Sequence, residues 1–255
     1  MATVIACFKW VVDEAYIRRG PSGDLDFSSV DYKIGEYDRN AIEEAVRLKE
    51  ALGGKAIAVT VGMPEVTKGV KDALSRGTDE AYFIADSSFG NLDSSQTALI
   101  LAEVIRTRIE QYDVIICGDG SSDLYAQQVG PRLAEQLGIP CISFVQKLSI
   151  GKDQIVAERR GEEGIEVITA PLPALVTVLP DINVPRIPGV KDTLMAGKKP
   201  LVKIAKDELP PMGEPLLRTV SIAASRMERS CERFGTDAAE ISRFVGSLRK
   251  KGVIG

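Results

Sequence analysis

The chain contains no histidine in its 255 residues. This absence excludes a Ser-His-Asp triad, a Cys-His dyad and metal sites built on imidazole. Proton-transfer catalysis would have to use Asp, Glu, Lys or Tyr side chains. A protein that moves electrons needs none of these groups in particular, because its cofactor carries the chemistry. The composition therefore disfavours the common hydrolytic sites and leaves a cofactor-dependent role open.

Cysteine is scarce and dispersed. The four cysteines are Cys7, Cys117, Cys141 and Cys231, and no CxxC motif occurs. We therefore expect neither a metal site nor a dithiol redox site. Cys7 and Cys117 lie within apolar, strand-like runs, where free cysteines are usually buried, reduced thiols.

Long apolar runs and a strong net charge are also missing. No apolar run reaches the roughly 18 residues that a transmembrane helix needs, so we expect no membrane span. The N-terminal segment lacks the basic residues that precede the apolar stretch of a signal peptide, so none is predicted there. We therefore expect a cytoplasmic location. The 32 basic and 36 acidic residues give a net charge of −4, which argues against a nucleic-acid partner.

The first 150 residues alternate between short β-rich runs and amphipathic helical patterns, with a composition typical of a folded globule. The expected strands are residues 3–10, 56–61, 81–85, 114–117 and 142–145. The expected helices are residues 38–52, 65–76, 93–109 and 123–137. This rhythm predicts an α/β fold, a mostly parallel sheet with helices on both faces.

The pattern changes after residue 150. Residues 154–159 and 165–169 indicate a hairpin, and residues 174–179 indicate one more strand. From residue 180 the chain is rich in proline and is not expected to supply regular backbone pairing. A terminal helix is expected at 236–250. We predict an α/β domain at 1–184 and an extended C-terminal arm at 185–255, which either wraps a partner or folds back on its own domain.

The segment from Gly118 to Gly130 follows an apolar strand at the edge where open α/β sheets bind ligands. Two glycines would allow a ligand to approach the backbone, and a following helix would offer free N–H groups to a phosphate or pyrophosphate. The third glycine of the dinucleotide fingerprint is missing. A tight turn in which Asp123 caps the helix explains the pattern equally well.

An ATP-dependent hydrolase or ligase on a similar fold is a further alternative. Such a protein would carry a phosphate-binding loop directly after its first strand. The residues there are Lys9-Trp-Val-Val12, without glycine, which counts against this alternative.

The Gly118 segment resembles the nucleotide loop of electron transfer flavoprotein β subunits. The matching positions are Gly118, Asp123, Gln127, Gln128 and Gly130. Further stretches resemble that family in the same order along the chain: Phe8-Lys9-Trp-Val-Val-Asp13, Tyr37-Asp38 with the helix that follows it, Ala73-Leu-Ser-Arg-Gly77, Leu172-Pro-Ala-Leu-Val176 and Asn183-Val-Pro-Arg186.

The resemblance implies a Rossmann-like nucleotide-binding fold and a heterodimer with an α subunit that carries the main FAD. Family β subunits hold either AMP or, in electron-bifurcating members, a second FAD. The segment Asp123-Leu-Tyr-Ala-Gln-Gln-Val-Gly130 lacks the acidic run of simple members and resembles the Fix-type and enoyl-CoA-reductase-associated branch, including the caffeyl-CoA-reductase-linked type. It implies FAD, with AMP as the alternative.

In that branch, two electrons enter from NADH. One passes to ferredoxin or flavodoxin, and the other passes through the α-subunit FAD to an acyl-CoA dehydrogenase or enoyl-CoA reductase. The loop at 187–195 corresponds to the family's docking loop for dehydrogenases, with Val190 where leucine is often found.

The resemblance also supplies candidate cofactor-binding residues. Gly35-Glu36 replaces the usual Asn-Pro, which leaves backbone contacts there. The full set is Cys7, Lys9, Gly35, Tyr37, Asp38, Val61, Gly62, Thr97, Gly118, Gly120, Ser121, Ser122, Asp123, Leu124, Tyr125, Ala126, Gln127, Gln128, Val129 and Gly130. No catalytic residue is expected in this chain.

Overall fold

The computed structural model describes residues 2–20, 24–224 and 231–255. Its contacts divide the chain into a main unit, Met1–Arg18 with Asp26–Ile222, and a second unit, Arg19–Leu25 with Ala223–Gly255. In the second unit, α6 (Ala238–Lys250) begins at the N-cap Asp237, which accepts hydrogen bonds from two backbone N–H groups of the first turn.

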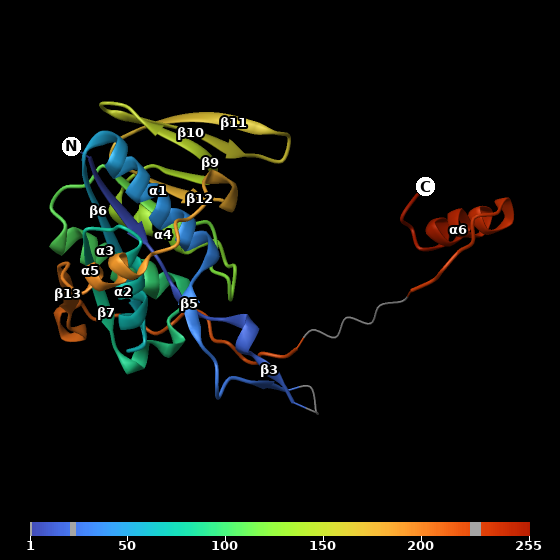
Figure 1. Cartoon of the computed structure of the whole chain (residues 1–255), viewed down its shortest axis with the longest axis horizontal. Coiled ribbons are helices and arrows are strands. Elements are labelled where there is room, and N and C mark those ends of the chain that lie inside the picture. Colours follow the sequence, from blue (N-terminus) through green and yellow to red (C-terminus); the bar gives the residue numbers. More distant parts are fainter. Residues whose placement is uncertain (1, 21–23, 225–230) are drawn as a thin grey trace. The chain divides into compact units, whose positions relative to one another are not determined.

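The main unit is built on a nine-stranded sheet (Figure 1). In spatial order its strands are β11 (Ile165–Pro171), β10 (Gln154–Arg160), β9 (Cys141–Ile150), β12 (Ala174–Val178), β8 (Val114–Gly118), β1 (Ala2–Cys7), β6 (Gly54–Gly62), β7 (Glu80–Ala85) and β13 (Leu201–Ile204). Strand β10 is antiparallel to both of its neighbours, and every other pairing in the sheet is parallel. The predicted α/β fold with a mostly parallel sheet is confirmed.

Helices cover both faces of this sheet. They are α1 (Glu36–Leu52), α2 (Val66–Ser75), α3 (Ser94–Arg108), α4 (Val129–Leu137) and α5 (Val190–Ala196). Short 3₁₀ helices lie at Glu14–Tyr16, Ser87–Asn91, Pro180–Ile182 and Lys206–Glu208. The remaining short strands are β2 (Trp10–Val12), β3 (Arg18–Arg19), β4 (Leu25–Asp26) and β5 (Tyr32–Ile34).

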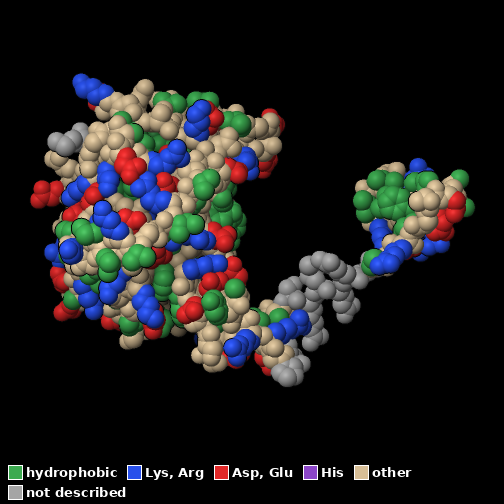
Figure 2. All heavy atoms as spheres, in the orientation of Figure 1, with side chains coloured by type: hydrophobic (Ala, Val, Ile, Leu, Met, Phe, Trp, Pro, Cys, Tyr) green, Lys and Arg blue, Asp and Glu red, His purple; other side chains and the backbone are tan. Residues whose placement is uncertain are grey.

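The central strands are apolar on both sides, as expected for a parallel sheet between two helical layers. Successive residues alternate between the layers, so Val4 packs in the same core as α1 and α2 while Ile5 packs with α3 and α4. Figure 2 shows acidic and basic side chains interspersed on the surface of this unit. Among the described residues, no helix is both long and apolar enough to cross a membrane.

Residues 180–186 are anchored on α1 by a polar network. Asn40 Nδ2 donates to the carbonyl oxygen of Asn183 at 2.9 Å, and Asn183 Nδ2 donates to Glu44 at 2.9 Å. Arg186 donates to the buried Glu43 and to the exposed Glu50, both at 2.8 Å. The start of the proline-rich segment therefore lies on its own domain.

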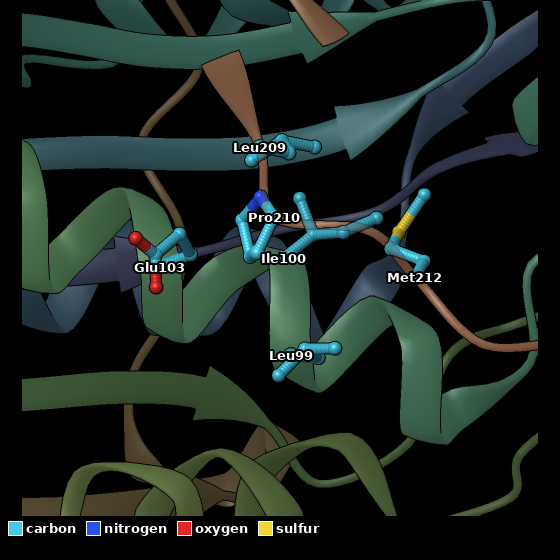
Figure 3. A pocket seen from close by; sticks show the side chains of 6 residues that line it. All are labelled: Leu99, Ile100, Glu103, Leu209, Pro210 and Met212. Atoms are coloured by element: carbon cyan, nitrogen blue, oxygen red, sulfur yellow. The ribbon is translucent and has the colours of Figure 1, made fainter. Parts of the chain in front are cut away.

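Beyond this anchor the proline-rich segment adds the edge strand β13, which pairs with β7 in parallel. The expectation that this segment supplies no regular pairing is wrong for residues 201–204, because the prolines stand outside them. The chain then runs along α3, where Leu209, Pro210 and Met212 share a shallow apolar hollow with Leu99 and Ile100 (Figure 3).

We expect Arg186→Ala to lower the free energy of unfolding by about 1–3 kcal/mol, because the buried Glu43 loses its cation. Glu50→Gln removes only the exposed contact of the same guanidinium and should cost less than about 1 kcal/mol. Urea denaturation of the full chain measures both. Equal losses in the two variants would contradict burial as the cause.

Candidate functional site

The predicted loop begins at the carboxyl end of β8, beside the carboxyl end of β1, and these two strands are neighbours in the middle of the sheet. From β1 the chain continues through α1 to β6 on one side, and from β8 it continues through α4 to β9 on the other. This reversal of direction is a topological switch point, where open α/β sheets bind their ligands.

Asp38 joins the two strand ends at the switch point. Its buried carboxylate accepts hydrogen bonds from the Lys9 N–H at 2.9 Å and from the Gly118 N–H at 3.2 Å. Burial raises the pKa of Asp38 to about 7, against the lowering effects of these two N–H donors and the Lys9 ammonium. The carboxyl group therefore fixes where the loop leaves β8.

Glycine is required at position 118 by this close approach. A Cβ atom there would lie 2.4 Å from Asp38 Oδ1 and 2.8 Å from Tyr37 Cβ. Any side chain would push the start of α1 away from the end of β8.

Two further contacts tie the loop to β1 and α1. Gly35, the N-cap of α1, has no side chain, and the Ser122 hydroxyl takes its place by accepting a hydrogen bond from the Glu36 N–H at 2.9 Å. Asp123 forms an ion pair with Lys9, with 2.6 Å between Oδ2 and Nζ. Burial raises the pKa of Asp123, but the Lys9 ammonium and local hydrogen bonds outweigh it and hold that pKa below its ordinary value.

The far side of the loop is anchored by Asp119, which is buried. Its carboxylate accepts hydrogen bonds from Gln127 Nε2 and from the Thr177 hydroxyl of β12, both at 2.6 Å. The Asp119 N–H donates to the carbonyl oxygen of Val178 at 3.1 Å. The loop is thus fixed at both ends by carboxylates.

Two loop residues adopt the left-handed conformation that non-glycine residues rarely take. The φ angles are 46° at Tyr125 and 56° at Gln127, and such strain gathers at functional sites. The Tyr125 ring lies over Gly120, where a Cβ would be 2.4 Å from it, and its centroid is 5.3 Å from that of Tyr37. A hydrogen bond with Tyr37, aided by partial burial, raises the pKa of Tyr125 to about 12.

Helix α4 begins at Val129 and not at Asp123. The predicted helix start and the reading of Asp123 as its cap are therefore wrong, because the left-handed residues interrupt the helix and Asp123 faces Lys9. No side chain caps α4. Gly130 allows the helix to approach β12, since a Cβ would lie 2.4 Å from Thr177 Cγ2. The first N–H groups of α4 are therefore available to an anion.

The remaining predicted residues lie at different distances from this centre. Cys7 is buried beside Cys117 in the register of β1 and β8, and Val61 and Gly62 end the next strand, β6. Thr97 lies within α3, where its hydroxyl donates to the Asp93 carbonyl oxygen at 2.8 Å. Among the described residues, no hydrogen bond joins Thr97 to the loop. Leu124 is 65% exposed at the crest of the loop.

The predicted set omits three residues that shape the loop: Asp119, Thr177 and Glu36. The sequence contained a clue to Asp119, because this residue stands between the two glycines of the loop motif. No sequence pattern distinguishes Thr177 from an ordinary strand residue. It lies beside the loop only because β12 pairs with β8.

We expect the stability of the folded chain to fall as the pH rises from about 4 to about 7 through Asp38. In this window the unfolded carboxyl, with a pKa near 3.8, has lost its proton while the folded one keeps it. The unfolded state therefore binds fewer protons, and increasing pH favours it. Asp38→Asn should reduce this slope in urea denaturation between pH 5 and 8.

The matched control is Asp26→Asn, because hydrogen bonds from Ser28 lower the pKa of that exposed carboxyl and it does not titrate in this range. The control should keep the slope of the parent chain. A slope left unchanged by Asp38→Asn would contradict a raised pKa at Asp38.

The electron transfer flavoprotein domain matches residues 24–209, which include most of the sheet, the contact of Asp38 with Gly118 and the whole loop. The match covers more than half of the chain and supports a role in electron transfer. The chain belongs to the electron transfer flavoprotein domain family.

Proposed function

We propose that the chain is the β subunit of an electron transfer flavoprotein and that it holds FAD at the loop from Gly118 to Gly130. The observation that carries this proposal is the position of that loop: it leaves the switch point of a sheet in a chain that matches the family domain. The motif order along residues 3–205 supports the β subunit in particular.

The residues present fit a bound nucleotide. An uncapped helix N-terminus follows the loop. The absence of side chains at its three glycines lets protein groups pack directly on the loop backbone and hold it at the switch point: Asp38 at Gly118, the Tyr125 ring at Gly120 and Thr177 at Gly130. Lys9 supplies a positive charge beside the loop. The N–H groups of α4 and the loop backbone would hold the phosphates, and the rest of the proposed set would border the remainder of the nucleotide.

The loop sequence favours FAD. Asp123 is followed by Leu124, Tyr125, Ala126 and Gln127, so a second negative charge does not follow it directly. The alternative is a non-bifurcating β subunit with structural AMP, in which the α subunit does all the electron work. When bound, FAD would supply a second redox centre between NADH and the α-subunit FAD.

The role of the protein groups is to bind this centre and to orient it. Asp38 fixes the loop against β1, while Asp119 fixes it against β12. Charges and hydrogen bonds near a flavin tune its potential. In a bifurcating complex, ferredoxin or flavodoxin would take one electron and a dehydrogenase flavin the other.

The part from residue 185 to residue 255 is proposed to contact the α subunit and the dehydrogenase. Exposed apolar side chains support this: Ile187 is 92% exposed and Val190 82% exposed around α5, and Phe244 is 43% exposed on α6. Figure 2 shows apolar side chains gathered on the second unit. Exposed apolar surface of this kind marks interaction sites.

We expect the co-purified αβ heterodimer to release two FAD and no AMP on acid denaturation. Chromatography of the released nucleotides measures both. One FAD and one AMP per heterodimer would contradict a second FAD in the β subunit and support the structural-AMP alternative. One FAD with no second nucleotide would contradict a nucleotide site at the loop altogether.

A matched pair of variants links the released nucleotide to the loop. Gly130→Val places a side chain where even a Cβ would lie 2.4 Å from Thr177, so it displaces the start of α4 and should lower the second FAD several-fold. Gly151→Val changes a glycine of the turn between β9 and β10, where an added Cβ would lie no closer than 3.4 Å to its nearest neighbour, Gln154, and it should leave the nucleotide content unchanged.

A further inference from the structure

The ion pair between Lys9 and Asp123 brings the positive charge of the site together with the loop itself. Lys9 follows β1, Asp123 lies in the loop after β8, and 2.6 Å separates Nζ from Oδ2. The two side chains are 43% and 34% exposed. A pair so open to water is weak and exchanges partners readily.

The surroundings of the loop are otherwise acidic. Asp119 lies near the start of the loop and reaches Gln127 at its far end, and Glu36 begins the helix beside the loop. A phosphate group entering this region needs the Lys9 ammonium more than it would in a neutral site, since each neighbouring carboxylate repels it. In the folded chain that ammonium is already paired with a carboxylate of the loop.

We propose that Asp123 is an internal competitor: in the nucleotide-free chain it occupies the position at Lys9 that an anionic group of the nucleotide takes on binding. This inference rests on the proposed function of the loop. Binding then exchanges one ion pair for another and frees the middle of the loop from β1. Asp123 thereby limits the affinity of the site for weak or partial ligands.

The loop is built to permit this exchange. Its ends are held by buried groups, Asp38 at Gly118 and Asp119 at Gln127, whereas its middle is held by Ser122 and Asp123 through exposed contacts. Tyr125, two residues after Asp123, has a left-handed backbone conformation, and a change in the loop backbone would relieve its strain. Breaking the Lys9–Asp123 contact leaves the anchors at both ends intact.

The test is calorimetric titration of the nucleotide-free full chain with AMP and, separately, with FAD. Asp123→Asn should bind both probes roughly two- to five-fold more tightly, the range expected for releasing a partly exposed ion pair. Lys9→Met should bind them more weakly. In the Lys9→Met chain, adding Asp123→Asn should bring no gain, because the competition needs the ammonium. Asp123→Ser replaces Asp123→Asn if the latter does not fold.

The matched control is Glu80→Gln, which makes the same change of charge at another 2.6 Å pair, Lys55 with Glu80, at the amino edge of the sheet. It should leave both affinities unchanged. The urea midpoints of all variants establish that each is folded under the titration conditions.

Each other outcome decides against the inference. Weaker binding by Asp123→Asn would show that the carboxylate contacts the nucleotide directly. A gain that persists in the Lys9→Met chain would show general repulsion in place of competition. No binding of either probe by the parent chain or any variant would overturn the proposed function, and the inference with it. Failure of the competition pattern alone leaves the proposed function standing.

Discussion

The site depends on one buried carboxyl group. Asp38 accepts an N–H from the end of β1 and another from the end of β8, and so joins two strands whose connections run in opposite directions. In a doubly wound sheet the gap between such strands is the natural ligand site. Because Asp38 bridges this gap through backbone donors, it sets the first residue of the loop without using the loop's own side chains.

The loop itself is an irregular segment that tertiary contacts hold in a strained form. Asp119 reaches across to Thr177 on β12, Ser122 caps α1 in place of Gly35, and two non-glycine residues are left-handed. A strained backbone persists only where its surroundings determine it. The unusual backbone conformations therefore lie between the end of β8 and the start of α4, where we propose that the nucleotide binds.

Several acidic side chains surround the loop, and Lys9 supplies a positive charge beside it. The chain has no histidine that could add another. Carboxylates both shape the loop and oppose an anionic ligand, and a single ion pair to Lys9 links these two effects. Electron transfer needs no proton-transfer residue from the protein, which is consistent with such a composition. In our proposal, the charges at the loop therefore affect nucleotide binding and take no part in proton transfer.

The sequence by itself determined the α/β class, most element positions and the location of the loop, because apolar periodicity and glycine placement are local properties. It also determined the resemblance to electron transfer flavoproteins, and the domain match confirms membership of that domain family. It misplaced the start of α4 and missed β13, since Asp123 and residues 201–204 take their conformations from distant partners, Lys9 and β7. Only the tertiary structure decided which groups hold the loop, Asp38 at Gly118 and Thr177 at Asp119, because residues as many as 80 positions apart come together through strand order, which no local pattern encodes.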